Sequence, residues 1–100
     1  MSLRDDIEAY VHANPDLPKA LYQFTVGDET VSVDLTNRRV WSGKAKQKPT
    51  DANPDVESTM SVAVYAEFRA ARLLLQMAFI DGRLKIKGSQ MRFLEFWRLI

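Results

Sequence analysis

The sequence predicts an α+β fold, with an about five-stranded, mainly antiparallel sheet and helices layered on one of its faces. Segments with apolar residues at every second position are typical of strands with one face in water. These segments are 22–26, 30–36, 40–42, 55–60 and 83–87. Segments with helical apolar spacing are 3–11, 62–80 and 90–100. One hundred residues suit one core, so we expect a single domain over residues 1–100.

The amino-terminal half predicts a helix followed by a meander of strands. Apolar residues recur at helical spacing from Leu3 to Val11, and the helix ends by Pro15. A Gly-Asp-Glu turn then joins the strand 22–26 to the strand 30–36 as a hairpin. Each of these strands has one apolar side and one polar side, so the sheet is expected to keep one face in water.

The stretch 77–89 is predicted to change from a buried helix to a strand and back to a helix. Gly82 ends the first helix, because glycine takes the left-handed conformation that closes a helix end. Leu84 and Ile86 then point to one face of a strand, and Ser89 is a suitable N-cap for the last helix. The basic residues on the other face of this strand are Arg83, Lys85 and Lys87.

The polar segment 43–54 has no apolar periodicity and is predicted to be a loop. Its lysines admit two interpretations. They could make a transient contact with an anionic membrane surface, or they could belong to a solvated linker. We favour the linker, because a charged loop is usually a solvated connection without a binding role. The lysines that suggested a membrane partner are Lys44, Lys46 and Lys48.

Composition limits the classes of function. The net charge of +1 gives no general case for nucleic acid, and a chain without cysteine has no disulfide, thiol nucleophile or thiolate metal ligand. No apolar run reaches the roughly 18 residues of a membrane span, and we expect a cytoplasmic protein. His12 is the single histidine, and no phosphate loop, nucleophile motif or metal-ligand spacing is present. We therefore expect neither an enzyme nor a cofactor or metal site.

The sequence Ala-Phe-Ile-Asp-Gly-Arg-Leu-Lys-Ile-Lys-Gly over residues 78–88 resembles the most recognisable motif of the sterol carrier protein 2 (SCP-2) family. The segments 22–24, 31–35 and 55–56 and the downstream Phe68 are similar to other family segments in order and approximate spacing. The resemblance covers about residues 17–99. The sequence departs from the family at Arg69-Ala70-Ala71-Arg72, where many members have a glycine in the middle of the helical segment.

The resemblance implies an apolar tunnel between helices and sheet that carries a lipid, such as a fatty acid, acyl-CoA, sterol or isoprenoid, without catalysis. Each candidate lining residue could equally belong to the core. Met77 and Met91 are favoured, because flexible thioethers adapt to ligands of different shape. The basic side chains of Lys85 and Lys87 could meet an anionic head group, a CoA phosphate or a membrane, but alternation places them on the wet sheet face, away from the tunnel, where we expect solvated strand residues. The candidate lipid-binding residues are Trp41, Phe68, Leu74, Met77, Phe79, Ile86, Met91, Leu94 and Trp97.

The alternative function is an accessory protein–protein interaction or dimerisation domain of an enzyme system, with no exchanged lipid. The last helical segment has a wide apolar arc that could form a homodimer interface if part of it were exposed. The residues of this arc are Phe93, Phe96, Trp97 and Ile100.

Overall fold

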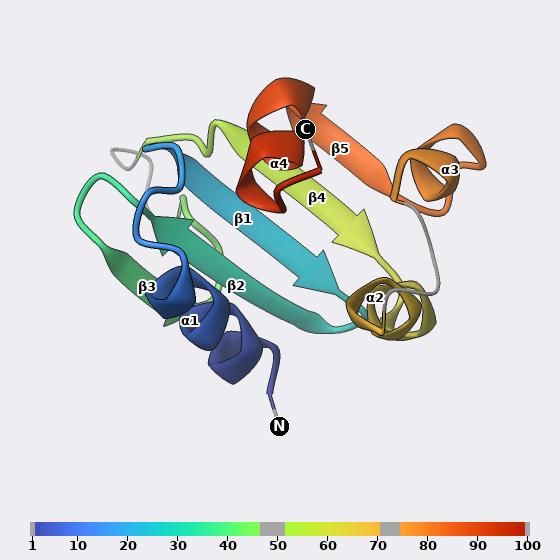
Figure 1. Ribbon diagram of the computed structural model, residues 1–100, viewed down its shortest axis with the longest axis horizontal. Helices are drawn as coiled ribbons and strands as arrows, with labels where there is room; N and C mark the ends of the chain where they lie inside the picture. The colour runs from blue at the N-terminus through green and yellow to red at the C-terminus, as the bar shows by residue number, and fades with distance from the viewer. Residues whose placement is uncertain (1, 47–51, 71–74, 100) are drawn as a thin grey trace.

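The computed structural model describes residues 2–46, 52–70 and 75–99 (Figure 1). The predicted helices and strands are confirmed, and the apolar segment 62–80 contributes two helices; residues 71–74 between them lie outside the described residues. The elements are α1 Leu3–Ala13, β1 Leu21–Val26, β2 Glu29–Asp34, β3 Arg39–Ser42, β4 Val56–Met60, α2 Val62–Arg69, α3 Leu75–Ile80, β5 Lys85–Gly88 and α4 Gln90–Phe96.

The five strands form one sheet in the order β3-β2-β1-β4-β5, and the described helices lie on one side of it (Figure 1). Neighbouring strands pair antiparallel, except that β1 and β4 run parallel. The predicted fold class is confirmed. The strands β3 and β4 run in the same direction, so the chain must return to the end of the sheet where β3 begins before β4 can start. The β3–β4 connection therefore crosses from the edge strand β3 to a position inside the sheet.

This connection partly covers the sheet face opposite the helices. Gln23, Ser32 and Trp41 are register neighbours on that face. The Ser32 hydroxyl donates to the Gly43 carbonyl at 2.7 Å, and the Ala45 backbone N–H donates to Gln23 Oε1 at 3.0 Å. The expectation of a fully wet face was therefore wrong at this point, because the backbone of the loop supplies partners to the polar side chains of the strands.

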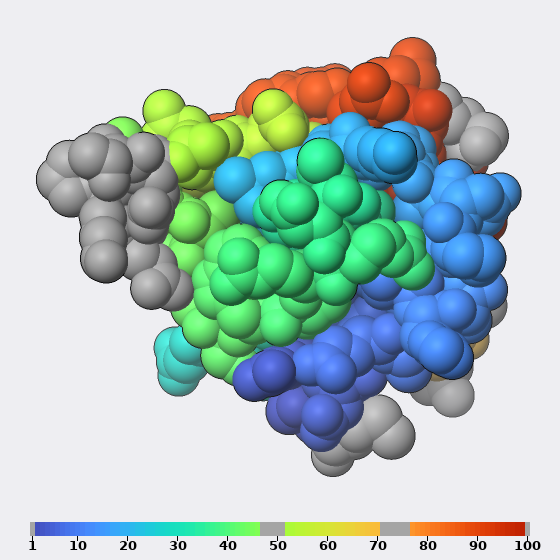
Figure 2. Space-filling model, turned by 90° about the vertical axis from the view of Figure 1, so that its left-hand side faces the viewer, coloured from blue at the N-terminus to red at the C-terminus, as the bar shows by residue number. Residues whose placement is uncertain are grey.

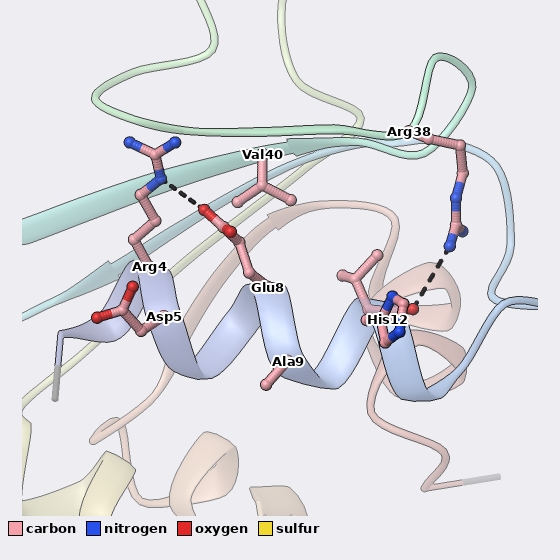
Figure 3. A pocket seen from close by; sticks show the side chains of 8 residues that line it. Arg4, Asp5, Glu8, Ala9, His12, Arg38 and Val40 are labelled. Atoms are coloured by element: carbon pink, nitrogen blue, oxygen red, sulfur yellow. Dashed lines mark hydrogen bonds and ion pairs between the residues drawn. The ribbon is translucent and has the colours of Figure 1, made fainter.

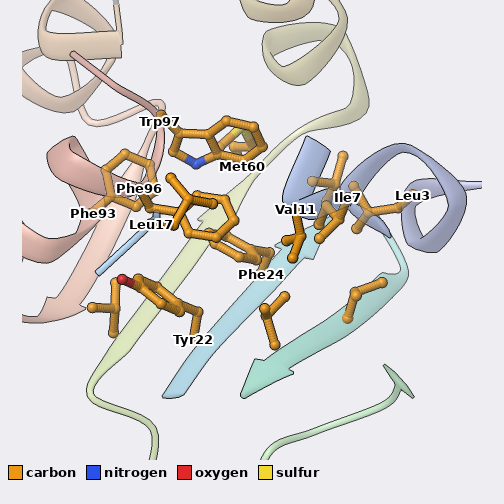
Figure 4. Close-up of a cluster of buried hydrophobic side chains, with 14 of the residues drawn as sticks. Leu3, Ile7, Val11, Leu17, Tyr22, Phe24, Met60, Phe93, Phe96 and Trp97 are labelled. Carbon is orange, nitrogen blue, oxygen red and sulfur yellow. The ribbon is translucent and has the colours of Figure 1, made fainter. Parts of the chain in front are cut away.

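An aromatic cluster fills the space between β1 and α4 (Figure 4). Tyr22 and Phe24 of β1 and Phe96 of α4 are buried, with the Phe96 ring centroid 4.7 Å from that of Tyr22 and 4.9 Å from that of Phe24. Trp97 continues the cluster 4.9 Å from Phe96.

The apolar arc that suggested a homodimer is thus the inner face of the protein's own core. Its members Phe93, Phe96 and Trp97 are all buried, and Ile100 lies outside the described residues. The spacing of apolar residues predicted a wide apolar face on this helix, but it did not show which parts of the protein cover that face. A partner could not reach these three described side chains, so the predicted interface is wrong at Phe93, Phe96 and Trp97.

The helix α1 packs on the other half of the same sheet face. Its buried residues Leu3, Ile7 and Val11 follow the predicted stripe, and the Ser2 hydroxyl caps its amino end by accepting from the Asp5 N–H. A polar contact then joins α1 to α2, because Asp6 accepts a hydrogen bond from the Tyr65 hydroxyl and pairs with Arg69 at 3.1 Å.

Alkaline pH is expected to unfold the protein from about pH 10 upward, where tyrosine ionises in an unfolded chain. Burial raises the pKa of Tyr22 to about 12 and raises the pKa of Tyr10. Burial is the main cause that raises the pKa of Tyr65, and the hydrogen bond to Asp6 is the second. The folded protein holds these protons more tightly, so their stabilisation is complete below the unfolded pKa and is lost as pH rises through the folded values.

The measurement is a pH titration that follows tyrosinate absorbance and far-ultraviolet circular dichroism on the same samples. We expect the two signals to change together. If the tyrosines ionised at their ordinary pH while the circular dichroism stayed unchanged, this coupling would be contradicted.

Candidate functional site

An apolar pocket of about 150 Å³ opens at the β5 edge of the sheet, between α3, β5 and α4. Among the residues that the structure describes, Gln90 is the one polar residue in its lining. Such a lining can enclose hydrocarbon and offers little to a charged ligand. The pocket is lined by Phe79, Ile80, Leu84, Ile86, Gln90, Phe93 and Leu94.

The turn after α3 builds one wall of this pocket. The N–H groups of Arg83 and Leu84 both donate to the Ala78 carbonyl, at 2.9 and 3.0 Å, so the chain folds back sharply toward the sheet. Ala78 is fully buried, and Leu84 is 2% exposed. The small side chain of Ala78 lets α3 approach the core, while Phe79 and Ile80 are left at the rim.

The cap of α4 builds the opposite wall. Ser89 accepts a hydrogen bond from the Arg92 N–H at 3.1 Å, as its predicted capping role requires. The helix that it starts places Phe93 against the core and Leu94 beside the pocket. Because Ile86 faces the same side of the sheet as Ser58, β5 closes the floor between the two helices.

Three of the candidate lipid-binding residues meet at this pocket, and five others that the structure describes lie elsewhere. Phe79, Ile86 and Leu94 line the pocket. Phe68 and Trp97 belong to the aromatic cluster instead, with their ring centroids 5.2 Å apart.

Three more candidates that the structure describes do not line the pocket. Trp41 is on the opposite face of the sheet, where its indole N–H donates to the Lys44 carbonyl. Met77 and Met91 are exposed, and Leu74 lies outside the described residues. The lining residues that pattern did not single out are Ile80, Leu84, Gln90 and Phe93; the first two lie within the family-like motif, and Phe93 lies in the apolar arc.

A buried hydroxyl without a partner lies next to the pocket floor. Ser58 of β4 stands in register between Phe24 and Ile86 on the inner face of the sheet and is 2% exposed. Within the described part of the chain its Oγ has no hydrogen-bond partner, and the same is true of the Trp97 indole nitrogen. An unpartnered buried polar group lowers stability by about 1–3 kcal/mol.

Replacing Ser58 with alanine is therefore expected to leave the free energy of unfolding unchanged or to raise it by about 1 kcal/mol. Ser32→Ala is the matched control, because Ser32 is also buried but donates to the Gly43 carbonyl. That variant is expected to lose about 1 kcal/mol. Urea unfolding of both variants measures the difference. A larger loss for Ser58→Ala than for Ser32→Ala would show that Ser58 has a partner in the folded protein.

A second groove, of about 690 Å³, lies between α1 and β3 (Figure 3), on the side of the molecule that faces the viewer in Figure 2. Four of its eight lining residues are charged: Arg4 pairs with Glu8 at 2.6 Å, and Arg38 donates to the Val11 carbonyl at 3.5 Å. A third hollow, of about 350 Å³, separates α1 from α2 and includes Asp6 and Arg69. Neither offers the continuous apolar lining of the pocket at the β5 edge.

Metal sites and membrane-spanning helices are absent from residues 2–46, 52–70 and 75–99. These residues contain no group of three or more His, Asp or Glu side chains placed to hold a metal ion. No helix among them is long and apolar enough to cross a membrane.

The model of the SCP-2 sterol transfer family matches residues 16–100. The chain belongs to the SCP-2 sterol transfer family. The resemblance carried by residues 78–88 is thereby confirmed, and most of the pocket lining falls within or next to this motif. A comparison of the sequence with curated proteins finds no match.

Solved SCP-2 structures share the fold. Sterol Carrier Protein 2 Like 2 from Aedes aegypti superposes with a TM-score of 0.74 at 23% identity, covering 96% of this chain and 91% of that one. Sterol Carrier Protein-2 from Aedes aegypti in complex with palmitate gives a TM-score of 0.66 at 16% identity, over 97% of this chain and 96% of that one.

The fold also occurs within an enzyme. The sec-alkylsulfatase Pisa1 from Pseudomonas sp. matches with a TM-score of 0.60 at 19% identity, over 81% of this chain but 13% of that one. An SCP-2 fold can thus form a small part of a much longer catalytic protein.

Proposed function

We propose that the protein binds a lipid or other long apolar molecule in the pocket at the β5 edge and carries it without changing it chemically. The observation that carries the proposal is the lining, in which six of the seven residues are apolar and Gln90 is the seventh. Membership of a sterol transfer family supports it, and a palmitate complex of an Aedes aegypti protein with this fold supports the fatty-acid class.

The pocket must enlarge to hold such a molecule. Its volume of about 150 Å³ is that of a cavity that holds benzene, whereas sites for larger ligands have about 300–1,000 Å³. The helix α3 is the wall best suited to move, because it is short and Met77, Phe79 and Ile80 are all exposed. We propose that α3 swings away from β5 and α4 as the ligand enters.

Burial of hydrocarbon supplies enough free energy for this movement. A sixteen-carbon chain gains about 0.8 kcal/mol per buried methylene, or roughly 12 kcal/mol before the costs of ordering and movement. No polar contact is required for useful affinity. The small volume of the pocket is also consistent with a protein that remains folded without ligand, since a large dry cavity would cost about 24 cal/mol per Å³.

Displacement of a fluorescent fatty acid by palmitate tests the proposal. We expect Ile86→Phe with Leu94→Phe, which fills the pocket, to weaken binding by at least about tenfold, the effect of losing roughly two methylenes of burial. Val40→Phe is the matched control, because it adds the same ring to the groove between α1 and β3. Melting temperatures show whether each variant is folded. Equal binding by both variants, or no displacement from the wild type, would contradict the proposal.

The alkylsulfatase match supports a second candidate, in which the domain serves an enzyme as an accessory interaction domain without exchanging lipid. The exposed groove lined by α1 and β3 would then be a suitable contact, since the apolar arc of α4 is buried. Lipid extraction from freshly purified protein, followed by mass spectrometry, separates the two. Bound lipid favours carriage, while a lipid-free protein that also fails to take up fatty acid favours the accessory role.

A further inference from the structure

Exposed apolar side chains gather where the pocket reaches the surface. Ile80 is 81% exposed, Met77 56% and Phe79 37%, all on α3. Met91, in the first turn of α4, is 58% exposed. Phe79 and Ile80 also line the pocket, so the same surface contains the mouth of the pocket. Exposed side chains of this size so close together are typical of an interaction surface.

Basic side chains flank these apolar residues. The described residues 75–92 contain one acidic residue, Asp81, and four basic ones, although the whole chain has a net charge of only +1. Asp81 pairs with Arg83 at 2.8 Å. The basic residues are Arg83, Lys85, Lys87 and Arg92.

The two lysines can reach the surface because β5 is an edge strand. Lys85 and Lys87 are exposed, alternate with Ile86 and stand opposite Thr59 and Glu57 of β4. Within the described residues neither lysine forms an ion pair. Both lysines point to the sheet face opposite α3, since they alternate with Ile86, and their long side chains can extend past the free edge of the strand.

We infer that the edge formed by α3, β5 and the first turn of α4 docks on anionic membranes. The apolar side chains enter the boundary between headgroups and acyl chains, and the basic side chains contact lipid phosphates. This inference rests on the proposed function, because it places the mouth of the pocket against the bilayer from which a lipid would enter. It assigns the membrane contact to this edge rather than to the lysines of the segment 43–54.

Charge favours a membrane over a second copy of the chain. A symmetric dimer through this edge would bring the same basic side chains of both protomers together, and like charges oppose such a contact. An anionic bilayer supplies the opposite charge along the whole edge, and it also accepts flexible methionine and isoleucine side chains without a shaped partner surface.

Co-sedimentation of the full chain with phosphatidylcholine vesicles containing about one third phosphatidylserine, and with vesicles of phosphatidylcholine alone, tests the inference. We expect binding to the anionic vesicles that falls with added salt. Lys85→Gln with Lys87→Gln is expected to weaken it by about 25-fold, or about fivefold for each lysine. Met77→Ser with Met91→Ser removes the apolar part and is expected to weaken binding by at least about tenfold.

Two control variants remove the same kinds of side chain from other parts of the protein surface. Lys44→Gln with Lys46→Gln removes two lysines from the segment that follows β3, and Val62→Ser removes an apolar side chain that is 64% exposed on α2. Both are expected to bind vesicles like the wild type. Equal binding to neutral vesicles, no binding at all, or equal losses in the controls would overturn the inference. The inference would also be overturned if light scattering showed a dimer that dissociates in the Met77→Ser with Met91→Ser variant.

Failure of docking and failure of lipid carriage give different results. Neither methionine lines the pocket, so the methionine variant is expected to bind soluble fatty acid within about twofold of the wild type. Fatty-acid binding without vesicle binding in the wild type overturns docking and leaves the proposed function in place. Vesicle binding without fatty-acid binding supports docking and contradicts the proposed function.

Discussion

Replacing Phe96 with alanine is expected to lower the free energy of unfolding by about 3–5 kcal/mol. Its ring has no exposed surface and contacts Tyr22 and Phe24 of the sheet and Trp97 of the same segment. The Phe96 carbonyl also accepts a hydrogen bond from the Tyr10 hydroxyl at 2.5 Å, which joins α4 to α1. Alanine leaves a cavity between sheet and helix that these large rings cannot fill by small movements.

Phe79→Ala is the matched control for this substitution. Phe79 is 37% exposed at the rim of the pocket, so the same truncation is expected to cost about 1 kcal/mol or less. Urea unfolding followed by circular dichroism compares the two variants. Similar losses would show that α4 does not pack in the core as described. A Phe96→Glu variant that stayed folded and changed only its oligomeric state would show that Phe96 lies at an interface and not in the core.

Gly88→Ala is expected to destabilise the protein by about 3 kcal/mol or more and to abolish fatty-acid binding. Gly88 has φ 88°, and a Cβ there would lie 2.1 Å from the Asp55 carbonyl oxygen, which is backbone and cannot rotate away. The same Asp55 carbonyl accepts the Ser89 N–H at 3.0 Å, so the clash falls where β5 leaves β4 and α4 begins. Separation of β5 would remove Ile86 from the pocket floor.

Gly82→Ala distinguishes the clash from backbone strain. Gly82 has φ 79°, but a Cβ there would meet no atom within 4 Å. Only the left-handed conformation is then disfavoured, at about 1–2 kcal/mol. Thermal melts and fatty-acid displacement measure both variants. Equal effects of the two substitutions would show that the close approach of Gly88 to β4 is absent in solution.

Residue periodicity predicted the elements because each has one face in the core. Alternation in β1, β2 and β5 and the helical stripe of α1 are local properties of the chain, and the predicted cap Ser89 depends on near neighbours alone. The parallel pairing of β1 with β4 could not be predicted in this way. Alternation fixes which side chains share a face but does not specify the strand next to it.

The candidate site was harder to predict for the same reason. Phe79 and Phe93 are equally apolar in the sequence, yet one is at the rim of a pocket and the other is fully buried. Trp41 belongs to a strand of four residues, too short for its pattern to show which face the indole would occupy. Ser58 lies in an otherwise apolar row, which predicts its inward direction, but its missing partner depends on segments far away in the chain.

Titration of the methyl-labelled protein with palmitate, followed by nuclear magnetic resonance, tests most directly whether the pocket at the β5 edge holds lipid. The methyl groups of Ile80, Leu84, Ile86 and Leu94 report on this pocket, and those of Val11 and Val40 report on the groove between α1 and β3. We predict large shift changes at the first set, the greatest on α3, and almost none at the second. No shifts at saturating palmitate, or shifts centred on Val11 and Val40, would contradict lipid binding at the β5 edge.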